Sequence, residues 1–132
     1  MHEEQITTVR GVREVLALYS DLHDAELSNV SLDLKASTAS LIFCAEQYPT
    51  EQVYRVALTI QRLLFFEVFT PSRTKPGFEN FAFPVSGLVE EISVDPTDGY
   101  ITVIVRGTYG WRIECAAHIL GVTTLQQDGG GG

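Results

Sequence analysis

The sequence predicts an α+β fold in which one N-terminal helix is followed by a mostly antiparallel sheet of about six strands. Apolar residues recur with the helical period only over residues 9–20, and with a period of two in the segments that follow. The segment Asp95-Pro96-Thr97-Asp98-Gly99 separates two alternating stretches and is typical of a hairpin turn. At 132 residues, the chain is expected to form one domain over residues 1–125, followed by a flexible Gly-rich tail at 126–132.

A single amphipathic helix is expected at residues 9–20. Thr7 or Thr8 is a suitable N-cap, because a threonine hydroxyl accepts from the free amide groups of the first turn. Four apolar residues are spaced i, i+3, i+4 and i+7 and so share one stripe: Val12, Val15, Leu16 and Tyr19.

The first four strands are predicted from alternating apolar residues. Residues 30–34 and 41–45 are expected to pair as a hairpin, residues 53–60 to form a third strand and residues 63–69 a fourth. Gln61-Arg62 would be a turn or bulge between the last two. The fourth strand is apolar on both faces, which indicates a central strand or one covered by the helix. The expected inward-facing residues are Val30, Leu32, Leu34, Leu41, Phe43, Ala45, Tyr54, Val56, Leu58 and Ile60.

The second half of the chain predicts a loop and three further strands. Residues 70–77 (TPSRTKPG) are expected to be a loop, and residues 78–84 carry Phe78, Phe81 and Phe83. Strands are expected at 88–94, at 100–106 and from Trp111 onward, with a break between Gly107 and Gly110. On the last strand, Trp111, Ile113, Cys115 and Ala117 would face the core, with Arg112, Glu114 and His118 opposite.

The charge balance is strongly acidic, with 17 acidic and 9 basic residues and a net charge of −8. Such a chain is poorly suited to nucleic acid or to an anionic membrane surface, because it lacks the basic residues that neutralise phosphates. An acidic field favours association with a basic partner. Solubility alone explains such a charge equally well.

Cys44 and Cys115 are the only cysteines, and they form no Cys-x-x-Cys pair. We therefore expect two buried free thiols in a reducing compartment. Met1-His2-Glu3-Glu4 is acidic where a signal peptide would be basic, so a cytoplasmic location is expected.

The densest polar motif contains Asp21, His23, Asp24 and Glu26 within six positions. It would serve either as a metal or acid/base site, or as a polar junction between helix and sheet. In the second interpretation, Asp21 or Asp24 caps a turn and His23 bonds a backbone carbonyl. We favour the second, because one histidine without nearby nitrogen or sulfur donors is a poor transition-metal set.

A second acidic group, Glu90, Glu91, Asp95 and Asp98, surrounds the predicted hairpin. It would be either a solvated strip or a docking surface for a basic partner, and both interpretations remain open. Tyr109 lies in a Gly-flanked turn and is a candidate interface anchor.

The sequence contains no complete catalytic constellation. The serines lack a glycine elbow, and there is no phosphate-binding loop or dinucleotide fingerprint. We therefore predict a non-enzymatic protein with no catalytic residues, no cofactor and no metal.

The order of four stretches resembles the immunity protein 50 family, small bacterial proteins of polymorphic-toxin systems. Residues 23–27 (HDAEL) resemble the family's His-Asp-Ala-Glu start of a strand, which residues 30–33 continue. Asn80 before the strand at 88–94, and Tyr109-Gly110 before Ile113-Glu114-Cys115, resemble its later segments. The likeness spans residues 22–117; the N-terminal helix is longer than in the family, and residues 70–77 are an insertion.

The resemblance implies a cytoplasmic inhibitor that binds and neutralises a cognate toxin by occlusion. Combined with the charge, it predicts a basic toxin domain as partner. The alternatives are a small-ligand or metal-binding domain built on His23, Asp24 and Glu26, and a self-associating module, a homodimer, that pairs through an open sheet edge. The predicted partner-binding residues are Glu90, Glu91, Asp95 and Tyr109, with Asp24 and Glu26 second.

Overall fold

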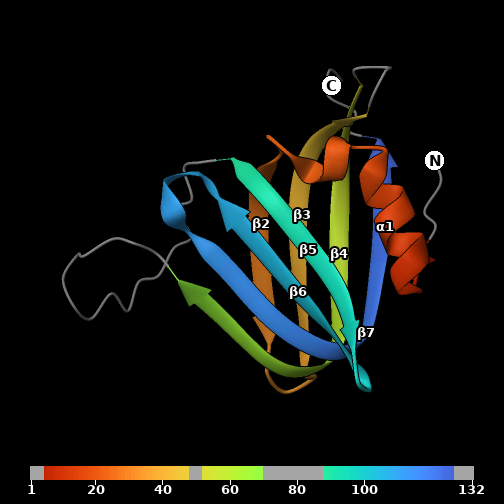
Figure 1. Ribbon diagram of the computed structural model, residues 1–132, viewed down its shortest axis with the longest axis vertical. Coiled ribbons are helices and arrows are strands. Elements are labelled where there is room, and N and C mark those ends of the chain that lie inside the picture. Colours follow the sequence, from red (N-terminus) through yellow and green to blue (C-terminus); the bar gives the residue numbers. More distant parts are fainter. Residues whose placement is uncertain (1–4, 48–51, 70–87, 127–132) are drawn as a thin grey trace.

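The computed structural model describes residues 5–47, 52–69 and 88–126 (Figure 1). Within these residues the chain forms one α-helix, two short 3-10 helices and a seven-stranded antiparallel sheet with the order β2-β3-β4-β7-β6-β5, while β1 pairs with β7. The predicted α+β fold with an N-terminal helix is confirmed. The elements are β1 (Gln5–Ile6), α1 (Val9–Ala17), η1 (Ser20–Leu22), β2 (Glu26–Asp33), β3 (Thr38–Gln47), β4 (Gln52–Phe69), β5 (Val89–Thr97), β6 (Tyr100–Gly107), η2 (Thr108–Gly110) and β7 (Arg112–Gln126).

The helix begins where its capping residue predicts. The Thr8 side-chain oxygen accepts a hydrogen bond from the Gly11 amide at 3.0 Å, which confirms one of the two predicted caps. The helix ends at Ala17, earlier than expected, but Tyr19 still lies in the core with Val12 and Leu16.

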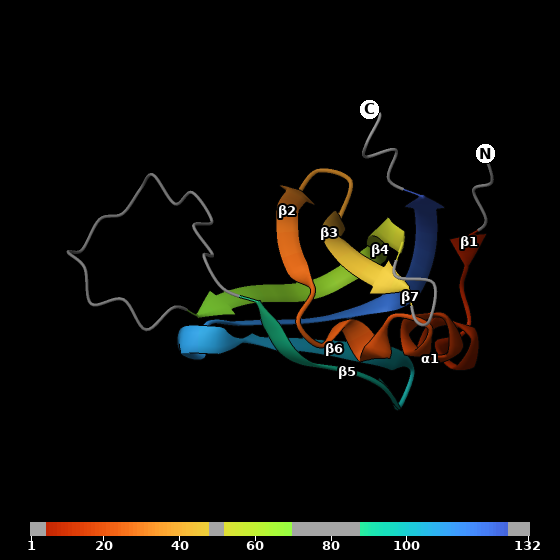
Figure 2. The same ribbon diagram turned by 90° about the horizontal axis from the view of Figure 1, so that it is seen from above.

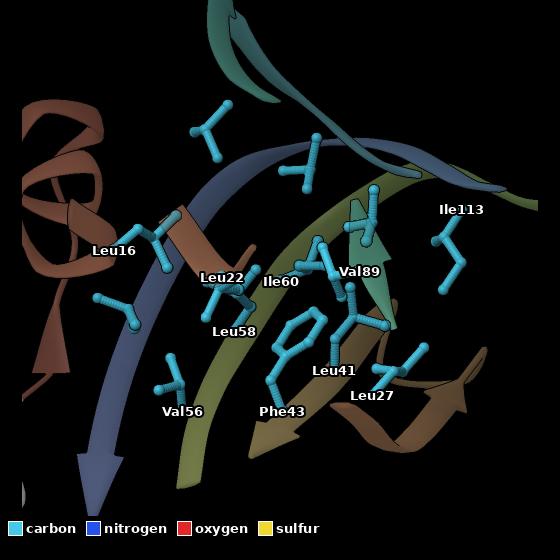
Figure 3. Close-up of a cluster of buried hydrophobic side chains, with 14 of the residues drawn as sticks. Leu16, Leu22, Leu27, Leu41, Phe43, Val56, Leu58, Ile60, Val89 and Ile113 are labelled. Carbon is cyan, nitrogen blue, oxygen red and sulfur yellow. The ribbon is translucent and has the colours of Figure 1, made fainter. Parts of the chain in front are cut away.

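The sheet is strongly curved, and its concave face holds the core (Figures 1 and 2). α1 packs against β5 and β7 at one end of this face. Side chains from β3 and β4 fill the middle of this face. There Phe43, Leu41 and Leu58 point toward Leu22 of η1 and Val89 of β5 (Figure 3). Burial of these apolar side chains is the main stabilising contribution.

The third and fourth predicted strands are one strand, β4. Arg62 has φ +58°, and the pairing register with β7 shifts between Leu63 and Phe65. The predicted bulge therefore bends β4 without ending it. Of the two predicted alternatives the first is confirmed, because β4 is an internal strand between β3 and β7. The helix does not cover residues 63–69: α1 packs against β5 and β7, and Leu64, Phe65 and Phe69 are exposed.

Two expected core residues of the first hairpin are exposed. Leu32 and Leu34 have exposed fractions of 44% and 76%. Leu32 pairs with the buried Ala39 and so has the expected face, but it lies on the edge strand β2 close to the turn, and Leu34 falls in that turn. Alternation in sequence predicts the face of a residue but not how near it lies to the edge of the sheet.

The second hairpin and the last strand agree with expectation. Asp98-Gly99 joins β5 to β6, with Gly99 at φ +81°. Trp111, Ile113 and Cys115 are buried. β7 runs through Gln126, so the predicted tail boundary is one residue early. The predicted loop at 70–77, the aromatic segment at 78–84 and residues 127–132 lie outside the described residues.

Cys44 lies on β3 and Cys115 on β7. β4 lies between their strands, so a disulfide between them is not formed in this fold. Cys115 is fully buried, whereas Cys44 is only partly buried, which corrects the expectation for the second thiol. None of the described helices has the length and apolar character needed to cross a membrane.

Candidate functional site

The two edge strands of the sheet meet at one corner. The Asp24 amide donates to the Val89 carbonyl at 2.8 Å, and the Val89 amide donates to the Ala25 carbonyl, also at 2.8 Å. Glu26 and Leu88 form an antiparallel bridge at the same place. The start of β2 thus pairs briefly with the start of β5, although some 64 positions separate them in sequence. We call this junction, residues 24–26 and 88–90, the seam.

His23 ties the seam together through its side chain. Its Nδ1 lies 3.0 Å from the Glu90 carbonyl oxygen, which confirms the expected bond to a backbone carbonyl. Because a carbonyl only accepts, Nδ1 is the nitrogen that carries the hydrogen. The other nitrogen, Nε2, lies 3.8 Å from the Asp24 carboxylate. The histidine is thereby oriented as a structural link between the seam's two chain segments.

The backbone before the seam has an unusual conformation. Ser20, Asp21, Leu22 and Asp24 all have positive φ, between 53° and 70°. Aspartate tolerates this left-handed region better than most residues, but leucine does not. Leu22 is fully buried, so the core holds the chain in a tight turn here. Asp21 and Asp24 therefore lie in turn conformations, but no side-chain hydrogen bond caps the start of η1, so the expected cap stays a prediction.

The seam gathers carboxylates from two predicted groups. Asp24 and Glu26 come from the first acidic motif and Glu90 from the second, and all three are exposed. They surround one junction, so the fold joins two candidate sites that the sequence kept apart. We call these three side chains the acidic seam. Exposed carboxylates gathered at one junction are chemically suited to a cationic group.

The other predicted acidic residues of β5 are engaged by arginines. The Asp95 carboxylate accepts from Arg13 Nη2 at 2.9 Å, and the same guanidinium donates to the Val94 carbonyl from Nε at 2.9 Å and from Nη2 at 2.6 Å. Glu91 lies 3.9 Å from Arg106. Asp95 therefore serves first to join β5 to α1, and Glu91 is partly neutralised by its cross-strand neighbour.

A cavity of about 440 Å³ opens beside the seam, between η1 and β3. His23, Asp24 and Glu46 line its polar side, and Tyr19 and Cys44 also contribute. With two carboxylates and no basic side chain other than the histidine among its described lining, it suits a cationic group. Glu46 was not predicted as a site residue, since nothing in its local sequence marks it.

The two aromatic residues near the Gly107–Gly110 break were given different roles, Tyr109 as an interface anchor and Trp111 as a core residue. Tyr109 lies in η2, but its side chain is outside the part of the chain described in detail. Trp111 is buried and belongs to the core, as expected. The arginines that engage the acidic residues were not predicted, because their pairing depends on strand register and on helix placement.

The described side chains around the seam are mainly carboxylates with one histidine. Among the described residues no group of three or more His, Cys, Asp or Glu side chains is arranged to hold a metal ion. Burial and, to a smaller extent, the neighbouring Glu114 carboxylate raise the pKa of Cys115 to about 12. That thiol is therefore a poor nucleophile at neutral pH. Comparison of the chain with protein-family models, curated proteins and solved structures gave no match.

Proposed function

We propose that this protein is a cytoplasmic, immunity-type inhibitor that binds a basic toxin domain through the acidic seam and neutralises it by occlusion. The observation that carries the proposal is the junction of Asp24, Glu26 and Glu90, which concentrates exposed negative charge on a structurally fixed corner. The net charge of −8 adds a long-range attraction for the same class of partner. The role needs no catalytic residue.

The stiffness of the corner supports a binding role. Two backbone hydrogen bonds, the bridge and the His23 side chain hold the carboxylates before a partner arrives. A surface that is already ordered loses less conformational entropy on binding than a flexible one. The adjacent cavity would receive a lysine or arginine side chain of the partner next to Asp24 and Glu46.

Capture from native cell extract at low and high salt tests the proposal. The test variant is Asp24→Lys/Glu26→Lys/Glu90→Lys, and the control is Glu14→Lys/Asp33→Lys/Asp98→Lys, which has the same net charge and exposed positions. We expect one basic protein to be retained by the wild type and by the control, released by salt, and lost from the seam variant. Equal retention by both variants would refute the seam as the site.

A second candidate is a small-ligand-binding domain, favoured by the cavity beside His23 and Asp24. A panel of divalent metal ions and of a small diamine, followed by thermal unfolding, tests it. A saturable rise in midpoint with one of them, lost in Asp24→Asn, would support this candidate. No rise at any concentration would rule it out for these ligand classes.

A further inference from the structure

A second pocket, of about 430 Å³, lies on the other side of Glu90, where β6 turns into β7. Its lining includes Phe69, Glu90, Arg106, Gly107, Trp111 and Arg112. We call it the arginine pocket. Its lining carries two arginines against one glutamate, so it is locally positive in a protein whose net charge is −8.

The two arginines are direct neighbours on the adjacent strands β6 and β7. Arg106 on β6 and Arg112 on β7 are directly paired in the antiparallel register. Side chains in such a position have Cβ atoms about 5 Å apart, and like charges there destabilise the pair. Repulsion between two neighbouring guanidinium groups is unfavourable unless nearby carboxylates or a bound anion compensate it.

The neighbouring carboxylates relieve this repulsion only in part. Glu91 is 3.9 Å from Arg106 and Glu114 is 3.6 Å from Arg112, both longer than a hydrogen bond. Neither glutamate is part of the pocket lining, and both pairs are solvent-exposed enough to be weak. Glu67, the cross-strand neighbour of Glu114, is also absent from the lining.

The Arg112 guanidinium is positioned by Phe69, and its Nε donor is not used in a hydrogen bond among the described residues. Its guanidinium carbon lies 4.4 Å from the centre of the Phe69 ring, a cation–π contact that fixes the plane of the group. Its Nε is buried and has no hydrogen-bond partner among the described residues. A buried donor without a partner is costly, and the planar guanidinium fork matches an oxyanion.

The pocket floor is fixed by a glycine. A Cβ at Gly107 would lie 1.7 Å from the Trp111 ring, so only glycine lets the indole pack against this backbone. Gly107 also donates from its amide to the Trp111 carbonyl at 2.9 Å. The lining of the arginine pocket is thus formed before any ligand enters.

We propose that the arginine pocket binds an oxyanion, the phosphate or carboxylate group of a ligand, between the guanidinium groups of Arg106 and Arg112. The anion satisfies donors on both arginines and removes their mutual repulsion. This site shares Glu90 with the acidic seam but takes a ligand of the opposite charge.

The only tryptophan of the chain lines this pocket, so its fluorescence reports binding. The titrants are inorganic phosphate and succinate, which separate the two sources of the oxyanion, with sodium chloride at equal ionic strength as reference. The variants are Arg106→Gln and Arg112→Gln, and the matched control is Arg55→Gln, an exposed arginine of β4 outside the pocket.

We expect a saturable change with phosphate or succinate in the wild type and in Arg55→Gln, and an apparent affinity about tenfold weaker in each pocket variant. Arg112→Lys keeps the charge but not the fork, and should bind with intermediate affinity. Thermal unfolding with the same titrants guards against a misfolded variant, since only a folded pocket gives a ligand-dependent midpoint. A wild-type response equal to that of chloride, or one unchanged in both pocket variants, would overturn the proposal.

Discussion

The acidic seam and the arginine pocket share Glu90 and have opposite charge. The Glu90 carbonyl accepts from His23 in the seam, and the same residue lines the arginine pocket. Both sites form where the curved sheet changes direction: the seam where β2 meets β5, and the pocket where β6 turns into β7. The net charge of −8 therefore has the same sign as the local charge of the seam and the opposite sign to that of the pocket.

The acidic seam and the arginine pocket also differ in how far their residues can be recognised from the sequence. Two of the three seam carboxylates are close in sequence, in a motif that any inspection of the chain would find. The two arginines are six positions apart, but only the antiparallel register places them opposite each other. A local motif supplies two of the three seam carboxylates, whereas the two arginines are brought together by strand pairing alone.

The largest expected difference is in thiol reactivity. Cys44 lines the cavity beside the seam, whereas Cys115 is fully buried beside Glu114, with a pKa of about 12. At pH 8 only about one Cys115 in ten thousand is a thiolate, so we expect a maleimide to modify Cys44 alone in the folded protein. Peptide mapping after brief labelling measures this, with urea-unfolded protein as the control. Rapid labelling of Cys115 in the fold would contradict the assignment.

The same thiol predicts how stability depends on pH. Its pKa is about 12 in the folded protein and 9.0 as the ordinary value, so the unfolded chain loses the proton first. The contribution of Cys115 is constant below pH 9 and is lost as pH rises toward 12. The loss should be absent in Cys115→Ala when urea unfolding is compared across this range. An identical pH profile in that variant would show that other groups dominate.

The next largest effect concerns the arginine pocket. Gly107→Ala places a methyl group within the Trp111 ring and should cost about 3 kcal/mol of unfolding free energy, since the core cannot absorb it without shifting. Gly99→Ala is the control: it has open space around its Cβ and strains only the backbone at φ +81°, so it should cost about 1 kcal/mol. Urea unfolding measures both. Equal losses would mean that Trp111 is not confined as described.

Loss of the histidine link should affect the seam moderately. His23→Ala removes the bond to the Glu90 carbonyl and should cost about 1 kcal/mol, because that bond is only partly shielded from water. Hydrogen exchange of the Asp24 and Val89 amides should become faster, while amides in β4 keep their rates. His118, which makes a similar 3.0 Å contact with the Gly99 carbonyl, is the matched control. Unchanged exchange at the seam would show that the backbone bonds alone hold it.

The smallest expected effect distinguishes two predicted binding residues. Asp95 is already paired with Arg13, so Asp95→Asn should weaken partner capture less than Asp24→Asn does. Its stability should change by less than about 1 kcal/mol, as for other exposed ion pairs. Capture by the two variants at a fixed low salt concentration makes the comparison. A greater loss with Asp95→Asn would move the binding surface from the seam to β5.

Local features of the fold were predictable from sequence. The Thr8 cap, the Asp98-Gly99 turn and the alternation of Leu41 and Phe43 depend on nearest neighbours, and each is present. The position of the bulge at Gln61-Arg62 was predicted, but the continuation of β4 through it as one bent strand was not. Whether a bulge ends or bends a strand depends on the partner strand, here β7.

The candidate site was less predictable because it depends on distant pairing. No local pattern places Asp24 next to Val89, or Arg13 next to Asp95. The exposure of Leu32 was unpredictable for a similar reason, since alternation indicates its face but not that it lies on the edge strand β2. The acidic residues could be named from the sequence, but their grouping and their arginine partners required the fold.

The most direct test of the central claim is the association rate constant between this protein and its captured basic partner, measured over a range of ionic strength. We expect the wild-type rate to fall about tenfold or more from low to high salt, and the Asp24→Lys/Glu26→Lys/Glu90→Lys variant to be slow throughout. The Glu14→Lys/Asp33→Lys/Asp98→Lys control, with the same net charge, should keep most of the salt dependence. A wild-type rate that does not change with salt, or a seam variant that associates as fast as the control, would contradict it.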